Sequence, residues 1–182
     1  LGGLDLEKEG TAGTKPAIRI FYSYSHKDER LRNELETHLR LLQRHGLIDP
    51  WQDRLIDPGD EWKPEIDQNL ERADIILLLI SADFIASDYC HDIEMKRALE
   101  RHSKGEARVI PVILREVDWR IAQFKKLQPL PKDGKPVTAW RTKDKGWRNV
   151  AEGIRKAVEE MRRVPRDTGR RNRLPHLGSA RL

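Results

Sequence analysis

The chain has 182 residues, of which 37% are hydrophobic and 36% charged, and its formal net charge is +5. This length fits one domain, and apolar residues gathered in tight blocks argue against global disorder. No apolar run reaches the roughly 18 residues of a membrane span, and residues 1–15 lack the pattern of a secretion signal. The lone cysteine, Cys90, excludes a disulfide framework and fits a reducing compartment, so we expect a cytoplasmic protein.

The positive charge is concentrated at the C-terminal end. From Arg162 to Leu182, seven arginines stand against one aspartate, so this stretch carries +6 and the rest of the chain −1. A basic tail can contact nucleic acid, an acidic lipid surface or an acidic partner, or it can be a solvated linker. We favour the linker, because the tail lacks the interleaved aromatics of single-strand binding. Residues 1–15 are expected to be a flexible leader, and residues 163–182 a disordered basic tail.

Strand and helix signals begin after the leader. Residues 17–24 (AIRIFYSY) are β-branched and aromatic and predict a first strand. Residues 25–27 form a polar turn, and Asp28 favours a helix start. The helix that follows carries leucines on one face and ends at Gly46. Those leucines are Leu31, Leu35, Leu39 and Leu42.

A loop separates the next strand from the next helix. Residues 47–51 predict a short second strand, and residues 52–60 (QDRLIDPGD) a loop with a Pro-Gly turn. Trp62, Ile66 and Leu70 are four apart and mark a short helix.

Two unbroken apolar runs follow. Residues 75–80 (IILLLI) and 109–114 (VIPVIL) are typical of parallel strands buried on both faces. Between them we expect a loop or short turn at 81–89 and a helix at 90–102. Pro111 indicates a position where one ladder donor is not needed.

The last third is irregular until its final helix. Residues 116–136 are proline-rich, and residues 137–140 predict a weak edge strand. The final helix has an apolar stripe made of Trp147, Val150, Ile154, Val158 and Met161. We therefore expect an α/β domain over residues 16–162, a flavodoxin-like open parallel five-stranded sheet with helices on both faces.

The sequence lacks the motifs of several common nucleotide-binding, metal-binding and catalytic sites. It has no GxxxxGK[ST] phosphate loop, no GxGxxG after the first strand, and no HExxH or GxSxG. Its six histidines are scattered, and no metal site is expected. In open parallel sheets, ligands bind beyond the carboxyl ends of strands. That rule nominates residues 22–28, 52–62 and 81–94.

Three strings in those segments carry a family resemblance. RIFYSYSHKD resembles the first motif of the Toll/interleukin-receptor (TIR) domain, and DPWQDRLIDPGDEW resembles its loop after the second strand, the BB loop. SADFIASDYCHDIE is similar to the segment that holds the TIR catalytic glutamate. The resemblance, which is to the bacterial form, runs from about Lys15 to Arg162.

The resemblance implies one of two functions. Some TIR domains are adaptors that recruit other TIR domains, and others cleave NAD to nicotinamide and linear or cyclic ADP-ribose. Nicotinamide in NAD is a cationic pyridinium and leaves without a general acid, so one carboxylate near the ribose suffices, by analogy with glycosidases. NAD is then a substrate, and no cofactor is expected.

Glu94 is the candidate catalytic carboxylate. Many family members carry the acid four residues after an aromatic, but here Tyr89 is followed at the fourth position by Ile93, and Glu94 is the fifth. One residue rotates a helical side chain by about 100°, so the helix starts later or the site differs. Asp92 is the alternative acid. Glu94 could instead be a surface residue of its helix.

The resemblance nominates substrate-binding residues around that acid, each with a plainer alternative. Trp62 could cover the base or begin a helix stripe, Arg54 could meet the pyrophosphate or stay solvated, and Tyr89 could stack on nicotinamide or merely pack. The full set of candidates is Tyr24, Ser25, His26, Arg54, Trp62 and Tyr89.

The BB loop is the expected interaction loop under either function. TIR-like enzymes often build their site across two subunits, and head-to-tail contacts can grow into filaments. We expect self-association as the activating step, in bacterial defence signalling, with a fused or separate sensor as a further partner. The candidate loop residues are Asp53, Leu55, Ile56, Pro58 and Gly59.

Overall fold

The computed structural model describes residues 15–50, 68–87, 95–120 and 122–163. Within these residues the chain forms a four-stranded sheet whose strands all run parallel, in the order β2-β1-β3-β4. The strands are β1 (Ile18–Ser23), β2 (Ile48–Pro50), β3 (Ile75–Ile80) and β4 (Arg108–Ile113). The helices that cover the sheet are α1 (Glu29–Arg44), α3 (Ala82–Ala86), α4 (Met95–Ser103) and α5 (Lys143–Arg163).

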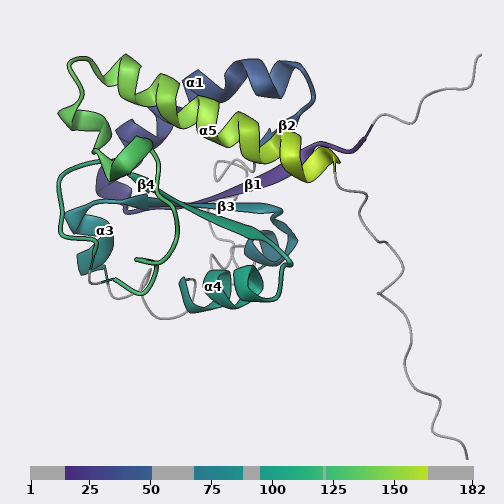
Figure 1. The fold of residues 1–182 in the computed structure, drawn as a ribbon, viewed down its shortest axis with the longest axis horizontal. Coiled ribbons are helices and arrows are strands. Elements are labelled where there is room, and N and C mark those ends of the chain that lie inside the picture. The colour runs from purple at the N-terminus through teal and green to yellow at the C-terminus, as the bar shows by residue number, and fades with distance from the viewer. Residues whose placement is uncertain (1–14, 51–67, 88–94, 121, 164–182) are drawn as a thin grey trace, which may run out of the picture.

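The sheet lies between two helical layers, which confirms the predicted α/β architecture. Helices α1 and α5 pack on one face, and α3 and α4 lie on the other (Figure 1). Strand β3 is buried along its whole length, as its unbroken apolar run predicts. Its side chains alternate between the layers: Leu77 and Leu79 join the α1/α5 core, and Ile76 and Leu78 the opposite core.

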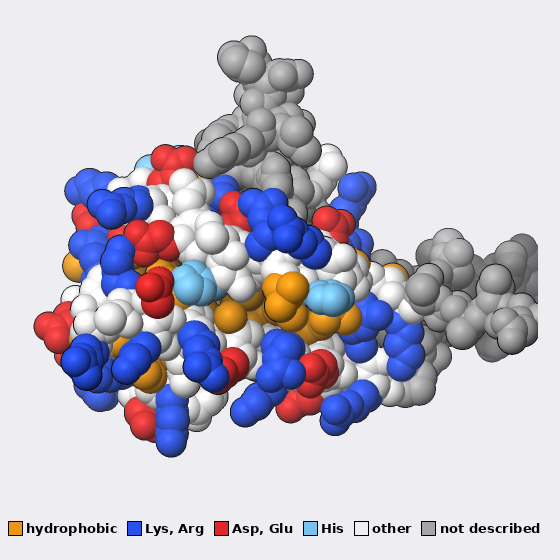
Figure 2. Space-filling model, turned by 90° about the horizontal axis from the view of Figure 1, so that it is seen from above, with side chains coloured by type: hydrophobic (Ala, Val, Ile, Leu, Met, Phe, Trp, Pro, Cys, Tyr) orange, Lys and Arg blue, Asp and Glu red, His pale blue; other side chains and the backbone are white. Residues whose placement is uncertain are grey.

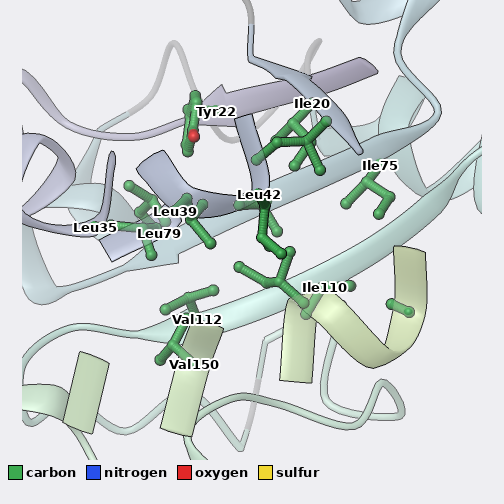
Figure 3. Close-up of a cluster of buried hydrophobic side chains, with 14 of the residues drawn as sticks. Ile20, Tyr22, Leu35, Leu39, Leu42, Ile75, Leu79, Ile110, Val112 and Val150 are labelled. Carbon is green, nitrogen blue, oxygen red and sulfur yellow. The ribbon is translucent and has the colours of Figure 1, made fainter. Parts of the chain in front are cut away.

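Helix α1 forms because its leucines recur at helical spacing. Leu35, Leu39 and Leu42 point at the sheet and meet Ile20 and Val112 in one cluster (Figure 3). Burying each of these leucines stabilises the fold by about 1.5–3 kcal/mol. Gly46 follows the helix with a φ of +63°, the left-handed conformation that glycine adopts without strain. The predicted helix end is therefore confirmed.

The outer face of the α1/α5 layer is strongly charged. Basic and acidic side chains interleave across it, with a narrow apolar strip between the two helices (Figure 2). Leu41, on α1, is a large hydrophobic residue that is exposed there. Isolated exposed leucines are ordinary on protein surfaces.

The prediction of a fifth strand at residues 137–140 is wrong for the described structure. Residues Val137–Ala139 form a 3-10 helix, and Thr138 donates its N–H to the Leu114 carbonyl, past the end of β4. The backbone donors on the outer edge of β4 are already used or missing. Val109 donates to Nδ1 of His102 at 3.2 Å, and Pro111 has no N–H, as its position in the sequence indicated.

The third backbone position on the outer edge of β4, the N–H of Ile113, is also hydrogen-bonded. The Ile113 N–H donates to the Leu130 carbonyl, and the Leu130 N–H returns to the Pro111 carbonyl, which makes an isolated bridge. A longer strand therefore has no ladder to join along this edge.

Residues 81–87 also differ in part from the expected loop or short turn. Ala82–Ala86 form the short helix α3, and Ser81 caps it by accepting the Phe84 N–H at Oγ, at 3.0 Å. Phe84 is fully buried, and this burial fixes the helix against β3. The predicted helix at 90–102 corresponds to α4, whose described part begins at Met95.

Candidate functional site

The turn after β1 carries three of the predicted substrate-binding residues. Ser25 begins a 3-10 turn over His26–Asp28, and its Oγ accepts the Lys27 N–H at 3.4 Å. Tyr24 is half-buried and His26 is exposed, with their rings edge to face at 6.4 Å. All three lie beyond the carboxyl end of β1, where a ligand of a parallel sheet is expected. The Ser25 hydroxyl already has a structural use, as a cap.

A buried arginine fixes the position of Tyr24. Arg32, on α1, holds its guanidinium 5.3 Å from the centre of the Tyr24 ring and 5.7 Å from that of Tyr22. Its Nη1 also donates to Glu36 at 2.8 Å. Stacking of a guanidinium on two aromatic rings restrains all three groups. Tyr24 is therefore presented in one orientation.

Tyr22, the other ring beside Arg32, is buried and not available to a ligand. Its ring is buried in the α1/α5 core, and its hydroxyl lacks a hydrogen-bond partner in the described part of the chain. Burial raises the pKa of the Tyr22 phenol, the charge of Glu36 raises it further, and Arg32 opposes them. The phenol is therefore neutral.

A second polar cluster joins the carboxyl ends of three strands. Asp28, whose side chain is only 1% exposed, follows β1, Ser81 follows β3, and Arg115 follows β4. Ser81 Oγ donates to Oδ2 of Asp28, and Nη2 of Arg115 lies 2.8 Å from its Oδ1. The sequence predicts Asp28 as a helix-starting residue, and it does precede α1, but its carboxylate makes no cap bond. It is turned toward the other two strands instead.

The same cluster reaches α3 through Asp83. Arg115 Nη2 donates to Oδ2 of Asp83 at 2.5 Å, and Lys27 Nζ donates to Oδ1 at 2.9 Å. These hydrogen bonds, from Arg115 first and Lys27 second, lower the pKa of Asp83. The pKa of Arg115 is raised by the same contact with Asp83, partly offset by burial, so both groups are ionised.

A shallow depression of about 430 Å³ lies over this cluster. Its four cations are paired: Lys143 and Arg30 share Glu34, and Lys27 and Arg115 bind Asp83. These four cations face three carboxylates, those of Asp28, Asp83 and Glu34, so one positive charge is left over. The depression is lined by Lys27, Asp28, Arg30, Leu31, Asp83, Arg115, Thr138 and Lys143.

The remaining predicted site residues lie outside the described part of the chain. This holds for the candidate acid and for the whole interaction loop. They are Glu94, Asp92, Tyr89, Trp62, Arg54, Asp53, Leu55, Ile56, Pro58 and Gly59.

The direction of α4, whose first described residue directly follows Glu94 in the sequence, can be determined. The far end of α4 is fixed by Arg101, which donates to the Leu70 and Ala73 carbonyls, just before β3 begins. Helix α4 therefore runs from the carboxyl end of the sheet toward its amino end, as a crossover between parallel strands must. Met95, its first described residue, is fully buried in the core between the sheet and the layer of α3 and α4.

Sequence reasoning did not single out Ser81, Asp83 or Arg115, although Ser81 and Asp83 lie within the nominated segment 81–94. Their contacts with Asp28 and Lys27 span 53 to 87 residues of sequence, so no local pattern predicts them. A usable signal was their shared place: each follows the carboxyl end of a predicted strand.

Comparison with known proteins identifies the family. The family model described as TIR domain matches residues 20–145, which is more than half of the chain. The chain therefore belongs to the TIR domain family, and the resemblance inferred from its motifs is confirmed.

The chain is also similar to a curated relative and to two solved structures. An uncharacterised protein of Sinorhizobium fredii, y4lF, is 53% identical over 145 residues, covering 80% of this chain and 45% of that protein. The chain thus spans less than half the length of this relative. The TIR domain of the Toll-related receptor TRR-2 of Hydra magnipapillata is 22% identical, with a TM-score of 0.48, over 76% of this chain and 97% of that one.

The second solved structure is that of the TIR domains of the activated Roq1 resistosome, described as directly recognising the pathogen effector XopQ. It is 17% identical, with a TM-score of 0.46, over 86% of this chain and 92% of that one. Both likenesses concern the fold.

No helix in the described part of the chain combines the length and the apolar composition that a membrane span needs.

Proposed function

We propose that this TIR domain hydrolyses NAD at the bond between nicotinamide and ribose, with Glu94 as the catalytic carboxylate. The observation that carries the proposal is that two nominated segments leave the sheet side by side, at the carboxyl ends of the neighbouring strands β1 and β3. The turn with Tyr24, Ser25 and His26 follows β1, and the SADFIASDYCHDIE segment leaves the neighbouring strand β3 at the same edge. Ligands of parallel sheets bind at that edge.

The chemistry requires few protein groups. The bond between C1′ and the pyridinium nitrogen breaks, and its electron pair neutralises the nitrogen, so nicotinamide leaves without a proton. Water then attacks C1′ and loses a proton, which gives ADP-ribose; attack by a nucleophile within the same molecule gives a cyclic product instead. An ionised carboxylate beside the ribose stabilises the developing positive charge at C1′.

The described residues would act around that centre. Tyr24, held by Arg32, is a half-buried aromatic side chain against which a flat base can pack. His26 is exposed and able to donate to a ribose or phosphate oxygen. In this proposal Arg54, Trp62 and Tyr89 complete the pocket, self-association through the BB loop switches it on, and the setting is bacterial defence signalling in the cytoplasm.

The test is nicotinamide release by the full chain at high concentration. Wild type is expected to release nicotinamide, and Glu94→Gln to lose at least a hundredfold in kcat. Glu100→Gln is the matched control, because Glu100 is a nearby glutamate on α4 that pairs with Arg97 and Lys104 on the surface. Asp92→Asn decides between the two candidate acids.

The outcomes separate the two functions of the family. Full activity in Glu94→Gln with loss in Asp92→Asn would move the acid to Asp92. An absence of turnover by wild type, even when crowded or assembled, would overturn the hydrolase and leave a non-catalytic TIR adaptor that binds other TIR domains.

A further inference from the structure

Arg115 has a structural role that its position in the sequence does not suggest. It follows β4, away from each segment that the motifs nominate, yet its guanidinium binds a carboxylate on each of two of them. On one side it contacts Asp28, in the turn after β1, and on the other Asp83, in α3. One side chain thus joins the turn that carries Tyr24–His26 to the helix that leads toward Glu94.

Both carboxylates of the cluster around Arg115 are engaged by its own donors. Both oxygens of Asp28 are occupied, Oδ2 by the Ser81 hydroxyl and Oδ1 by Arg115. Both oxygens of Asp83 are occupied as well, by Arg115 and Lys27. Two cations and two carboxylates balance. Such a charge-balanced network holds the segments that contribute to it in place.

We propose that Arg115 is a positioning residue for the site: by bridging Asp28 and Asp83 it sets the distance between the 23–28 turn and α3. This inference rests on the proposed function. Proximity contributes strongly to catalysis, and a displacement of about 1 Å can lower a rate a hundredfold. The two segments would otherwise be joined at this edge by the Ser81 hydroxyl and the flexible Lys27.

Arginine suits this bridge and lysine does not. The guanidinium places Nε 3.0 Å from Asp28 and Nη2 2.5 Å from Asp83 at the same time. A lysine ammonium is one point charge and cannot hold both carboxylates in the same geometry. Arg115→Lys therefore preserves the charge and loses the bridge.

The matched control is Arg108, at the opposite end of β4. Its side chain is 42% exposed, against 37% for Arg115, and it makes an ion pair with Glu160 at 2.8 Å. That pair lies at the amino end of the sheet. Arg108→Lys thus makes the same chemical change, on the same strand, away from the site.

The experiment compares full-length wild type with Arg115→Lys, Asp83→Ala and Arg108→Lys. Asp83→Ala removes the bridge while Asp28 keeps its arginine, so the buried carboxylate stays paired. Hydrogen–deuterium exchange is measured in peptides that cover residues 23–28 and 81–87, and kcat and KM for NAD are measured beside it. Both bridge variants are expected to exchange faster in the two segments and to lose about tenfold or more in kcat/KM relative to Arg108→Lys.

Each outcome of this experiment supports or overturns the positioning role of Arg115. Exchange equal to that of the Arg108→Lys control overturns the bridge, and faster exchange with unchanged kcat/KM overturns its positioning role. If wild type releases no nicotinamide, the proposed function fails, and exchange alone still shows whether Arg115 joins the two segments.

Discussion

Two arginines one turn apart on α4 have opposite surroundings. Arg97 is on the surface, where it pairs with Glu71 and Glu100. Arg101 is buried, and its Nη1 donates to the carbonyls of Leu70 and Ala73, at the end of the helical residues 68–72. The carbonyls at the end of a helix need such donors. Arg101 thus supplies them from another element.

Arg101→Met is therefore expected to destabilise the fold by about 2–3 kcal/mol, because it leaves buried carbonyls without a donor. Arg97→Met should leave the free energy of unfolding nearly unchanged, since exposed ion pairs contribute little. Urea unfolding followed by circular dichroism measures both. Equal losses in the two variants would mean that the carbonyls find other partners.

At the level of elements, one of the three positions that close the outer edge of β4 depends on a side chain, that of His102. His102 Nδ1 accepts the Val109 N–H, so the imidazole must be unprotonated at that nitrogen. His102→Ala should free this donor, at a cost of about 1 kcal/mol, and open a stretch of edge to pairing with another chain. Size-exclusion chromatography should show more self-association than in wild type. An unchanged elution profile together with unchanged stability would contradict this role.

The elements that depend on local pattern were predictable, and those that depend on distant partners were not. The IILLLI run fixes β3, and the leucine spacing fixes α1, because burial demands those patterns whatever surrounds them. Residues 137–140 have strand composition, but whether they pair depends on the free donors of β4, which His102, Pro111 and Leu130 remove. In the candidate site, the turn at Tyr24–His26 could be located by rule, but the Asp28–Arg115 bridge could not.

Helices α1 and α5 are joined by a carboxylate that responds to pH. Glu34 accepts hydrogen bonds from Lys143 and from the indole of Trp147. Partial burial alone would raise the pKa of Glu34, but those two hydrogen bonds outweigh it and lower the pKa below 4.5. A group with a lowered pKa stabilises the fold above its ordinary value, and that stability is lost as the pH falls through the folded pKa.

Glu34→Gln should therefore cost about 1–2 kcal/mol at pH 7, and this cost should shrink as the pH falls below about 4.5. Unfolding free energies from urea titrations between pH 7 and pH 3 give the difference directly. Glu152→Gln, which removes an exposed pair with Arg148 within α5, is the control and should show little change. A difference that stays constant with pH would show that the charge of Glu34 does not hold the helices together.

For the whole molecule, the two ends of the described chain meet far from the candidate site. Arg162, near the end of α5, donates to the carbonyls of Pro16 and Gly46, at the amino end of the sheet (Figure 1). The turn after β1 and the Asp28–Arg115 cluster lie at the opposite end. The described chain therefore begins and ends at the amino end of the sheet, and the candidate site lies at its carboxyl end.

At the scale of the assembly, mixing two inactive variants tests whether the proposed site is formed by one chain or by two. If the proposed site is built across two subunits, with the BB loop of one beside the pocket of the next, then a chain lacking the acid and a chain lacking the loop can complete each other. An equimolar mixture of Glu94→Gln with a Pro58→Ala/Gly59→Ala chain should recover part of the nicotinamide release that neither has alone. Recovery should rise with total protein concentration, since head-to-tail association obeys mass action. A mixture as inactive as its components, with both chains folded by circular dichroism, would place the whole reaction within a single subunit.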